Sequence, residues 1–174
     1  MALSTISVLV ENSAGVLSRV VGLITRRAYN IDSLAVGTTL DPSISRITIE
    51  LDCDDKAMVK QITAQILKLP PVKTVAVLNP RESIKRELIM IKVNTTNETR
   101  GNIIEIANIF RARVIDVSKS TVTIEMTGHT DKIDAIIELL NDFGIVEIVR
   151  TGAVALHRGT TKIEDFYQEY YEEF

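Results

Sequence analysis

The chain has 174 residues, 45% of them hydrophobic and 25% charged, with a formal net charge of -3 and a pI near 5.5. This composition is typical of a soluble globular protein that buries a core in one domain or in two small ones. The acidic balance and the scattered lysines and arginines argue against a nucleic-acid partner. No apolar run approaches the roughly 18 residues that a membrane span needs.

The cysteine and histidine content limits the chemistry that the chain can carry out. The single cysteine, Cys53, excludes an intrachain disulfide and a thiolate metal cluster, and it fits a reducing compartment. The two histidines, His129 and His157, have no partner close in sequence and are expected on the surface or in loops, so we expect no metal site. No signal or transit peptide is visible. The expected location is the cytoplasm of a bacterium, or the plastid stroma if the chain is organelle-encoded.

The first half of the chain alternates between strand and helix patterns. Thr5–Val10 is rich in strand-forming residues, and Val16–Arg27 carries apolar residues at helical spacing. Strands at 31–40, 46–51 and 72–78 follow, with a second helix that Asp54 or Asp55 caps and that ends at Pro70-Pro71. The order is β-α-β-β-α-β, which is the ferredoxin-like arrangement.

The same order of elements returns in the second half. Asn79–Ser83 is polar and contains a proline, as expected of a linker. The expected later strands are 88–93, 114–117, 122–126 and 145–149, the last either ending there or extended by 154–156. The expected helices run from Asn97 or Thr99 to Phe110 and from Thr130 to Phe143-Gly144. We therefore predict an α+β fold of two ferredoxin-like βαββαβ domains in tandem, with domains at 1–78 and 87–160, a linker at 79–86 and an acidic aromatic tail at 161–174.

The loop and helix start at Glu11–Arg19 form the candidate ligand site. The first N–H groups of a helix lack intrahelical partners, and together with the helix dipole they favour a carboxylate or phosphate. Gly15 allows close approach to the backbone, and Asn12 can both donate and accept hydrogen bonds. The alternative is that Asn12 or Ser13 caps the helix and Gly15 eases packing, and the local pattern leaves both interpretations open. The corresponding loop of the second half, Asn94–Arg100, is longer and lacks this glycine pattern.

The second strand is the expected dimer contact. In a ferredoxin-like sheet this strand normally lies at an edge, where its N–H and C=O groups are unpaired. Ile31–Thr39 contains no proline or lysine, and its one charge is Asp32, so little protects the edge. We predict that two copies pair there across a two-fold axis. The alternative is that the linker or the tail covers the edge.

Several short segments together resemble the ACT domain and the following region of the acetolactate synthase (acetohydroxyacid synthase) small-subunit family. The resemblance covers about residues 3 to 160, and the combination is more specific than any single segment. The segments that carry it are Ser7–Asn12, Gly15–Val20, Tyr29–Leu34, Asp41–Arg46, Ile109–Ala112, Ile115–Ser118, Glu147–Gly152 and Arg158-Gly159.

The resemblance implies a non-catalytic regulatory subunit, and it implies no catalytic residues and no cofactor in this chain. Such subunits bind valine, or in some members leucine or isoleucine, and confer feedback inhibition on a separate catalytic large subunit in branched-chain amino-acid biosynthesis. That partner holds thiamine diphosphate, FAD and Mg. By the family's pattern the effector lies between two ACT domains of a homodimer.

The resemblance also implies the residues that bind the effector. They are Asn12, Ala14, Gly15 and Val16 of one chain and Asn30 and Ile31 of the other. The backbone N–H groups of Gly15 and Val16 would take the carboxylate, and the amides of Asn12 and Asn30 would meet the polar end. Ile31 would line an apolar slot, and such a slot separates valine from a homologue one methylene longer by roughly 1–3 kcal/mol.

Two positions depart from the family's usual pattern. Ser13-Ala14 replaces a pair that more often contains an acidic residue and a proline, which makes the loop less rigid. Ala28 stands where a glycine usually ends the first helix, and alanine at positive φ costs about 1 kcal/mol relative to glycine. These departures bear on effector affinity more than on the fold.

The tail at 160–174 is unusually aromatic and acidic. Its aromatic residues are Phe166, Tyr167, Tyr170, Tyr171 and Phe174, and with Ile163 they recur at helical spacing. A docking helix and a frayed terminus are the two interpretations.

Two other classes of function remain open from the sequence. One is a structural dimerisation module that binds no ligand. The other is a small acylphosphatase-like hydrolase that would use Arg19 and an asparagine. The loop lacks the run of residues that would cradle a phosphate, and a hydrolase would leave the second domain unexplained.

Overall fold

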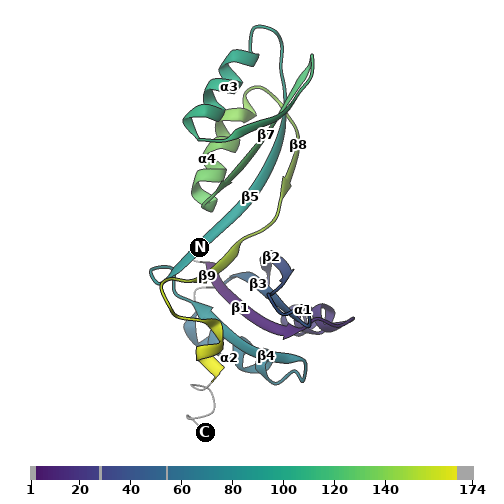
Figure 1. Cartoon of the computed structure of the whole chain (residues 1–174), viewed down its shortest axis with the longest axis vertical. Helices are drawn as coiled ribbons and strands as arrows, with labels where there is room; N and C mark the ends of the chain where they lie inside the picture. Colours follow the sequence, from purple (N-terminus) through teal and green to yellow (C-terminus); the bar gives the residue numbers. More distant parts are fainter. Residues whose placement is uncertain (1–2, 28, 54, 168–174) are drawn as a thin grey trace. The chain divides into compact units, whose positions relative to one another are not determined.

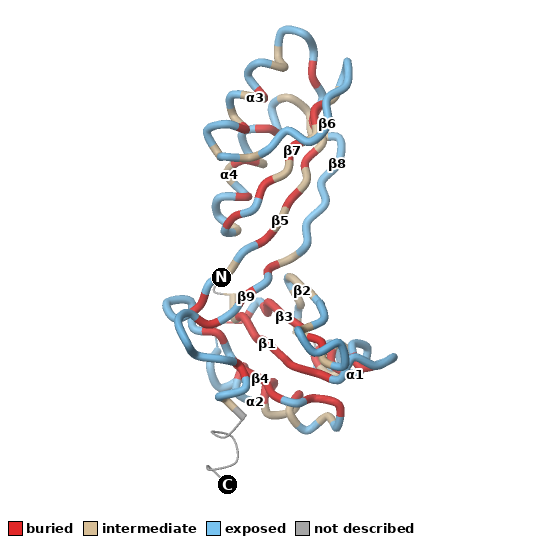
Figure 2. Tube along the Cα trace, viewed as in Figure 1, coloured by how far each residue is buried: buried red, intermediate tan, exposed pale blue. Residues whose placement is uncertain are grey.

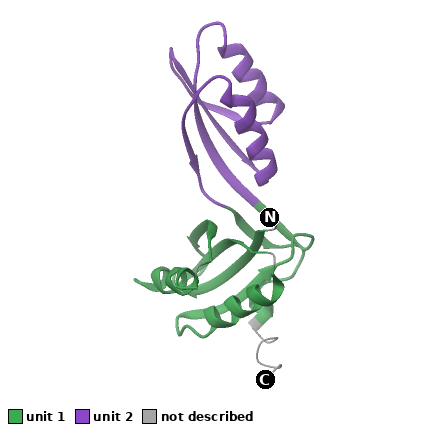
Figure 3. Ribbon diagram, turned by 180° about the vertical axis from the view of Figure 1, so that it is seen from behind, with its two compact units in different colours: residues 1–85, 153–174 green, residues 86–152 purple. Residues whose placement is uncertain are grey.

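A computed structural model describes residues 3–27, 29–53 and 55–167. The chain divides into two compact units, residues 1–85 with 153–174 and residues 86–152 (Figure 3). This division differs from the expected domain end at residue 160. The physical reason is that the segment after Gly152 packs against the sheet of the first unit.

The first unit contains a four-stranded antiparallel sheet in the order β2-β3-β1-β4 (Figure 1). Its elements are β1 (Leu3–Glu11), α1 (Val16–Thr25), β2 (Ile31–Thr38), β3 (Ile44–Asp52), α2 (Lys56–Leu67) and β4 (Val72–Leu78). The order confirms the predicted ferredoxin-like arrangement and places β2 and β4 at the two edges. Asp55 begins α2, as predicted, because its carboxylate accepts a hydrogen bond from the Ala57 N–H at 2.8 Å.

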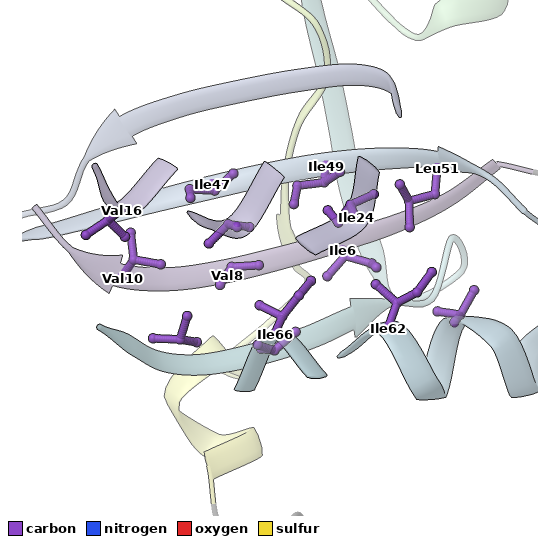
Figure 4. Packing of buried hydrophobic residues seen from close by; sticks show 14 of the residues in the cluster. Ile6, Val8, Val10, Val16, Ile24, Ile47, Ile49, Leu51, Ile62 and Ile66 are labelled. Carbon is purple, nitrogen blue, oxygen red and sulfur yellow. The ribbon is translucent and has the colours of Figure 1, made fainter. Parts of the chain in front are cut away.

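The core of the first unit lies between one face of this sheet and the two helices (Figure 4). Alternate residues of each strand point to that face, as the pleat of a strand requires. Its fully buried members include Ile6, Val8, Val20, Ile24, Ile47, Ile49, Leu51, Ile62 and Ile66. Burial of each such side chain contributes roughly 1.5–3 kcal/mol to the stability of the fold. This layer therefore holds α1 against the sheet.

The opposite face of the sheet is covered by β9 (Val154–His157) and the 3-10 helix η1 (Ile163–Tyr167). Most of β1 is coloured as buried in Figure 2. Ile163 packs against Leu9 and Ala76. The rings of His157 and Phe166 stack with their centroids 4.7 Å apart.

His157 is buried in this covering layer, with 8% of its surface exposed. The prediction that it lies at the surface was wrong, because alternate residues of β9 face inward. His129 is exposed, as expected. Of the tail, the structure describes the residues up to Tyr167, where η1 ends; Tyr170, Tyr171 and Phe174 lie outside the described residues.

The second unit repeats the arrangement, with strand order β6-β7-β5-β8. Its elements are β5 (Ser83–Asn94), α3 (Arg100–Ile109), β6 (Arg113–Val117), β7 (Thr121–Gly128), α4 (Thr130–Asn141) and β8 (Ile145–Arg150). Its buried core includes Ile89, Ile91, Ile103, Ile124 and Ile133. The turn after α4 has Gly144 at φ 85°, which is the predicted left-handed end.

Two connections differ from expectation. The turn that starts at Asn79 is short, and β5 already begins at Ser83, so its first residues belong to the first unit. The segment expected to extend the last strand is instead a separate strand, β9, which pairs with β5. Within the first unit, the Arg158 N–H donates to the Glu82 carbonyl at 2.8 Å and fixes this segment.

Candidate functional site

The loop between β1 and α1 takes its shape from Gly15. Gly15 is the N-cap of α1 and has φ 81°, in the left-handed region where residues with a Cβ are strained. Of the two interpretations, the one in which Asn12 or Ser13 caps the helix is not supported, because no side chain in the described part of the chain bonds to the helix start. A Cβ built at Gly15 meets nothing within 4 Å, so the glycine is needed for its backbone conformation and leaves open space above the loop.

Asn12 is fixed by the turn between β2 and β3. Its N–H donates to the Ser43 carbonyl at 2.7 Å, and its side-chain Nδ2 donates to the Pro42 carbonyl at 2.9 Å. The Asp41 carboxylate holds that turn by accepting from the Ser43 hydroxyl at 2.7 Å and from its N–H at 2.8 Å. These two hydrogen bonds lower the pKa of Asp41. The Oδ1 atom of Asn12 has no protein partner within the described ranges and remains available as an acceptor.

The start of α1 presents backbone donors to solvent. Among the described residues, the N–H groups of Gly15, Leu17 and Ser18 donate to no protein acceptor, and the N–H of Val16 reaches the Ser13 carbonyl only at 3.4 Å. The Val16 side chain is buried in the core and anchors the first turn. Unpaired N–H groups at a helix N-terminus favour a carboxylate. The described residues contain no group of three His, Cys, Asp or Glu that could hold a metal ion.

Asn30 and Ile31 lie at the other end of the same sheet. The Asp52 N–H donates to the Asn30 carbonyl at 3.4 Å, and Asp52 pairs with Leu3 at the beginning of β1. Asn12 follows the far end of β1, so the length of the strand, about 27 Å at 3.4 Å per residue, separates the two asparagines. One copy of the chain therefore does not bring together all the residues of the predicted site.

The edge strand β2 carries exposed backbone and apolar side chains. Its neighbour in the described sheet is β3, and its other side faces away. Val36 is 48% exposed, and Leu40 beyond the strand end is fully exposed. Leu17 on the first turn of α1 is also 40% exposed. An unpaired edge with apolar residues beside it is a typical site for pairing with another chain.

Sequence reasoning missed the turn at Asp41–Ser43 as a part of the site. The Asp-Pro-Ser signal predicts a turn, but its bonds to Asn12 join residues about thirty positions apart and follow from the register of β1 and β3. Of the two departures from the family pattern, Ser13-Ala14 is exposed in the loop, and Ala28 lies outside the described residues. No helix in the described ranges is both long and apolar enough for a membrane crossing.

Comparisons with known proteins agree along nearly the whole chain. Residues 6–74 match the family model described as AHAS small subunit-like ACT domain, and residues 86–159 match the model described as small subunit of acetolactate synthase. The chain is 50% identical over 159 residues to the probable acetolactate synthase small subunit of Archaeoglobus fulgidus. This alignment covers 91% of this chain and 98% of that protein. It is 46% identical over 155 residues to the acetolactate synthase small subunit of Mycolicibacterium smegmatis, with 89% and 91% covered.

A solved structure supports the same assignment. The crystal structure of the acetolactate synthase small subunit from Thermotoga maritima matches with a TM-score of 0.85 and 37% identity, and the match covers 92% of this chain and 100% of that one. The chain therefore belongs to the acetolactate synthase small-subunit family and carries that family's ACT domain at its N-terminus.

Proposed function

We propose that two copies of this chain bind a branched-chain amino acid, valine in the first place, between their ACT domains and so confer feedback inhibition on a separate catalytic subunit. The observation that carries the proposal is that the loop at Gly15 and the residue Asn30 lie at opposite ends of β2, whose outer side has no neighbour in the described sheet. The chain itself is non-catalytic in this proposal. The thiamine diphosphate, FAD and Mg chemistry belongs to the catalytic partner.

Antiparallel pairing of two β2 strands would complete the site. In each copy β2 runs from Ile31 beside Leu51 to Thr38 beside Ser45. When two such edges pair across a two-fold axis, the start of one strand lies beside the end of the other. Asn30 and Ile31 of one copy then lie near the loop at Asn12 of its neighbour. Two equivalent sites form, one at each end of the joined strands.

The loop suits the head group of a free amino acid. Its carboxylate would accept from the N–H groups of Gly15 and Val16, as the resemblance implies, and from the neighbouring free N–H of Leu17, with Ala14 as flanking backbone. Its ammonium would donate to the free Oδ1 of Asn12 and to the side-chain amide of the neighbour's Asn30. Ile31 is partly buried against its own core and exposes the remainder as an apolar wall for a branched side chain.

A ligand held by two copies supplies a regulatory mechanism. Effector binding stabilises the dimer arrangement that forms the site, and the catalytic subunit senses that arrangement. A coupling free energy of about 1–3 kcal/mol between the two sites is enough for strong inhibition.

Titration calorimetry of the purified chain with valine, leucine and isoleucine tests the ligand. We expect heat with valine, and at least about tenfold weaker binding for Asn12→Ala and Asn30→Ala, because each loses a buried hydrogen bond to a charged group. Asn97→Ala, which changes an exposed asparagine of the second unit, serves as the matched control and should bind like the wild type. No heat with any of the three amino acids would leave the structural dimerisation module as the better hypothesis.

Mixing the two weakened variants tests whether the site is shared between copies. A heterodimer of Asn12→Ala and Asn30→Ala contains one site with both substitutions and one site with neither. After exchange of subunits, about one site in four should regain wild-type affinity. If the site lay within one copy, mixing would restore none, and the two-copy geometry would be rejected.

A further inference from the structure

A groove of about 650 Å³ in the first unit is lined by the end of α2, by β4 and by Glu164 of η1. The end of α2 and the following turn supply an apolar wall that includes Leu67, Leu69 and Pro70. Thr74 also lines it, and the Thr74 hydroxyl is buried without a hydrogen-bond partner among the described residues.

Two lysines and one glutamate, Glu164, are the charged residues that line the groove in the described part of the chain. Lys68, at the end of α2, and Lys73, on β4, both line it and are exposed. The Lys73 ammonium bonds one oxygen of the exposed Glu11 carboxylate at 2.7 Å and retains further donor capacity. An apolar wall with two ammonium groups fits a segment that is both aromatic and acidic.

The described chain ends beside this groove. Glu164 of η1 lines it, and η1 continues to Tyr167. Residues 168–174 follow and read Gln-Glu-Tyr-Tyr-Glu-Glu-Phe, with three aromatic and three acidic side chains. Seven residues reach up to about 24 Å when extended.

We propose that residues 168–174 of the same chain dock in this groove. The aromatic side chains of Tyr170, Tyr171 and Phe174 pack on the apolar wall, and the neighbouring glutamates pair with Lys68 and Lys73. The tail is tethered to the rim, so its effective concentration is in the millimolar range and a modest intrinsic affinity suffices. Lys73 also pairs with Glu11, the first residue of the candidate ligand site, at 2.7 Å.

Carbodiimide cross-linking of the full chain, followed by peptide mass spectrometry, tests the contact. We expect zero-length amide links between Lys68 or Lys73 and the glutamates Glu169, Glu172 and Glu173. Lys56, exposed at the other end of α2, is the internal control and should give few such links. The substitution Lys56→Gln should leave the yield unchanged, whereas Lys68→Gln should lower it.

A second variant distinguishes docking from chance contact of a tail that is tethered close to the groove. Replacing Tyr170, Tyr171 and Phe174 by serine keeps every glutamate and the same tether. Docking predicts that the link yield then falls about fivefold or more, because aromatic anchors carry most of the contact free energy at such surfaces. An unchanged yield, or no links to Lys68 and Lys73 in the wild type, would overturn the proposal.

Isotope mixing decides which chain supplies the tail. An equal mixture of 15N-labelled and unlabelled chains, exchanged before cross-linking, should give links only between peptides of the same label. Links of mixed label at Lys68 or Lys73 would assign the tail to a second copy and would contradict docking within one chain.

Discussion

Replacing Gly15 by alanine tests the left-handed turn on which the effector loop depends. Gly15 has φ 81°, and a Cβ at this position meets no atom within 4 Å. The substitution therefore adds no steric clash, and its cost comes from the backbone alone. An L-residue in this conformation is strained by about 1–2 kcal/mol.

The unfolded state offsets part of this cost. Alanine restricts the unfolded chain and thereby favours folding by about 0.4–1 kcal/mol. The net destabilisation by Gly15→Ala should be about 1 kcal/mol, which lowers the Tm of a unit of this size by roughly 4–8 °C. A relaxed turn would also shift the N–H groups of Gly15 and Leu17, so valine binding should weaken at least about fivefold.

Gly22→Ala is the matched control for this experiment. Gly22 lies inside α1, also has nothing within 4 Å of a built Cβ, and has no positive φ. Alanine there should stabilise the chain by about 0.5–1 kcal/mol and leave valine binding unchanged. Thermal or urea unfolding of both variants gives the comparison. If Gly15→Ala were as stable as the wild type, the loop would not have the conformation described, and the argument for its free donors would fail.

Two further predictions concern the layer on the other face of the first sheet. Lys85→Met should destabilise the chain by about 2 kcal/mol, because the Glu50 carboxylate is buried and lies 2.6 Å from the Lys85 ammonium. The double variant Lys85→Met with Glu50→Gln no longer buries an unpaired charge, and urea unfolding should show that it recovers much of this loss. Burial, and after it the charge of Arg46, lowers the pKa of His157 below its usual 6.5. As the pH drops through and below about 6.5, the unfolded chain therefore takes up a proton at this position before the folded chain does. The free energy of unfolding falls in this pH range. Between about pH 7.5 and 5.5 the wild type should therefore lose more Tm than His157→Phe, with exposed His129→Gln behaving like the wild type, and equal slopes for all three would contradict this account.

The order of the elements was predictable because the local patterns are strong. The apolar alternation in β1 and β3 and the helical spacing in α2 each reflect one buried face. The edge position of β2 followed from the fold class and is confirmed. The ends of elements depended on single residues such as Asp55 and Gly144, whose cap and turn conformations are local properties.

The covering layer of the first sheet was not predictable from local pattern. β9 has four residues, too few for its alternation to indicate which face is buried. Whether His157 is buried depends on Phe166 and on a sheet whose last strand, β4, ends at Leu78, far earlier in the chain. The contact between Asn12 and the Pro42 carbonyl is long-range in the same way. The sequence could indicate the residue types of the site, but their partners depend on tertiary structure.

Although the fold is duplicated, the second unit lacks the features of the proposed effector site. We therefore expect one such site per chain and not two. In the second unit the loop before α3 bonds to itself: the N–H groups of Thr96 and Thr99 donate to hydroxyls within the loop, and Thr99, the N-cap, is right-handed where Gly15 is left-handed. The Arg100 guanidinium donates hydrogen bonds to the Ser118 and Lys119 carbonyls.

The head of β6 also lacks a counterpart of Asn30, because Ala112 precedes that strand. Neither the left-handed turn nor the second amide is present, so the second unit cannot hold an amino-acid head group in the proposed manner. Calorimetry should therefore give a stoichiometry near one valine per chain, and Thr96→Ala should leave it unchanged. A value near two, with half the heat lost in Thr96→Ala, would place a second site in that unit and would refute the reasoning from Gly15 and Asn30.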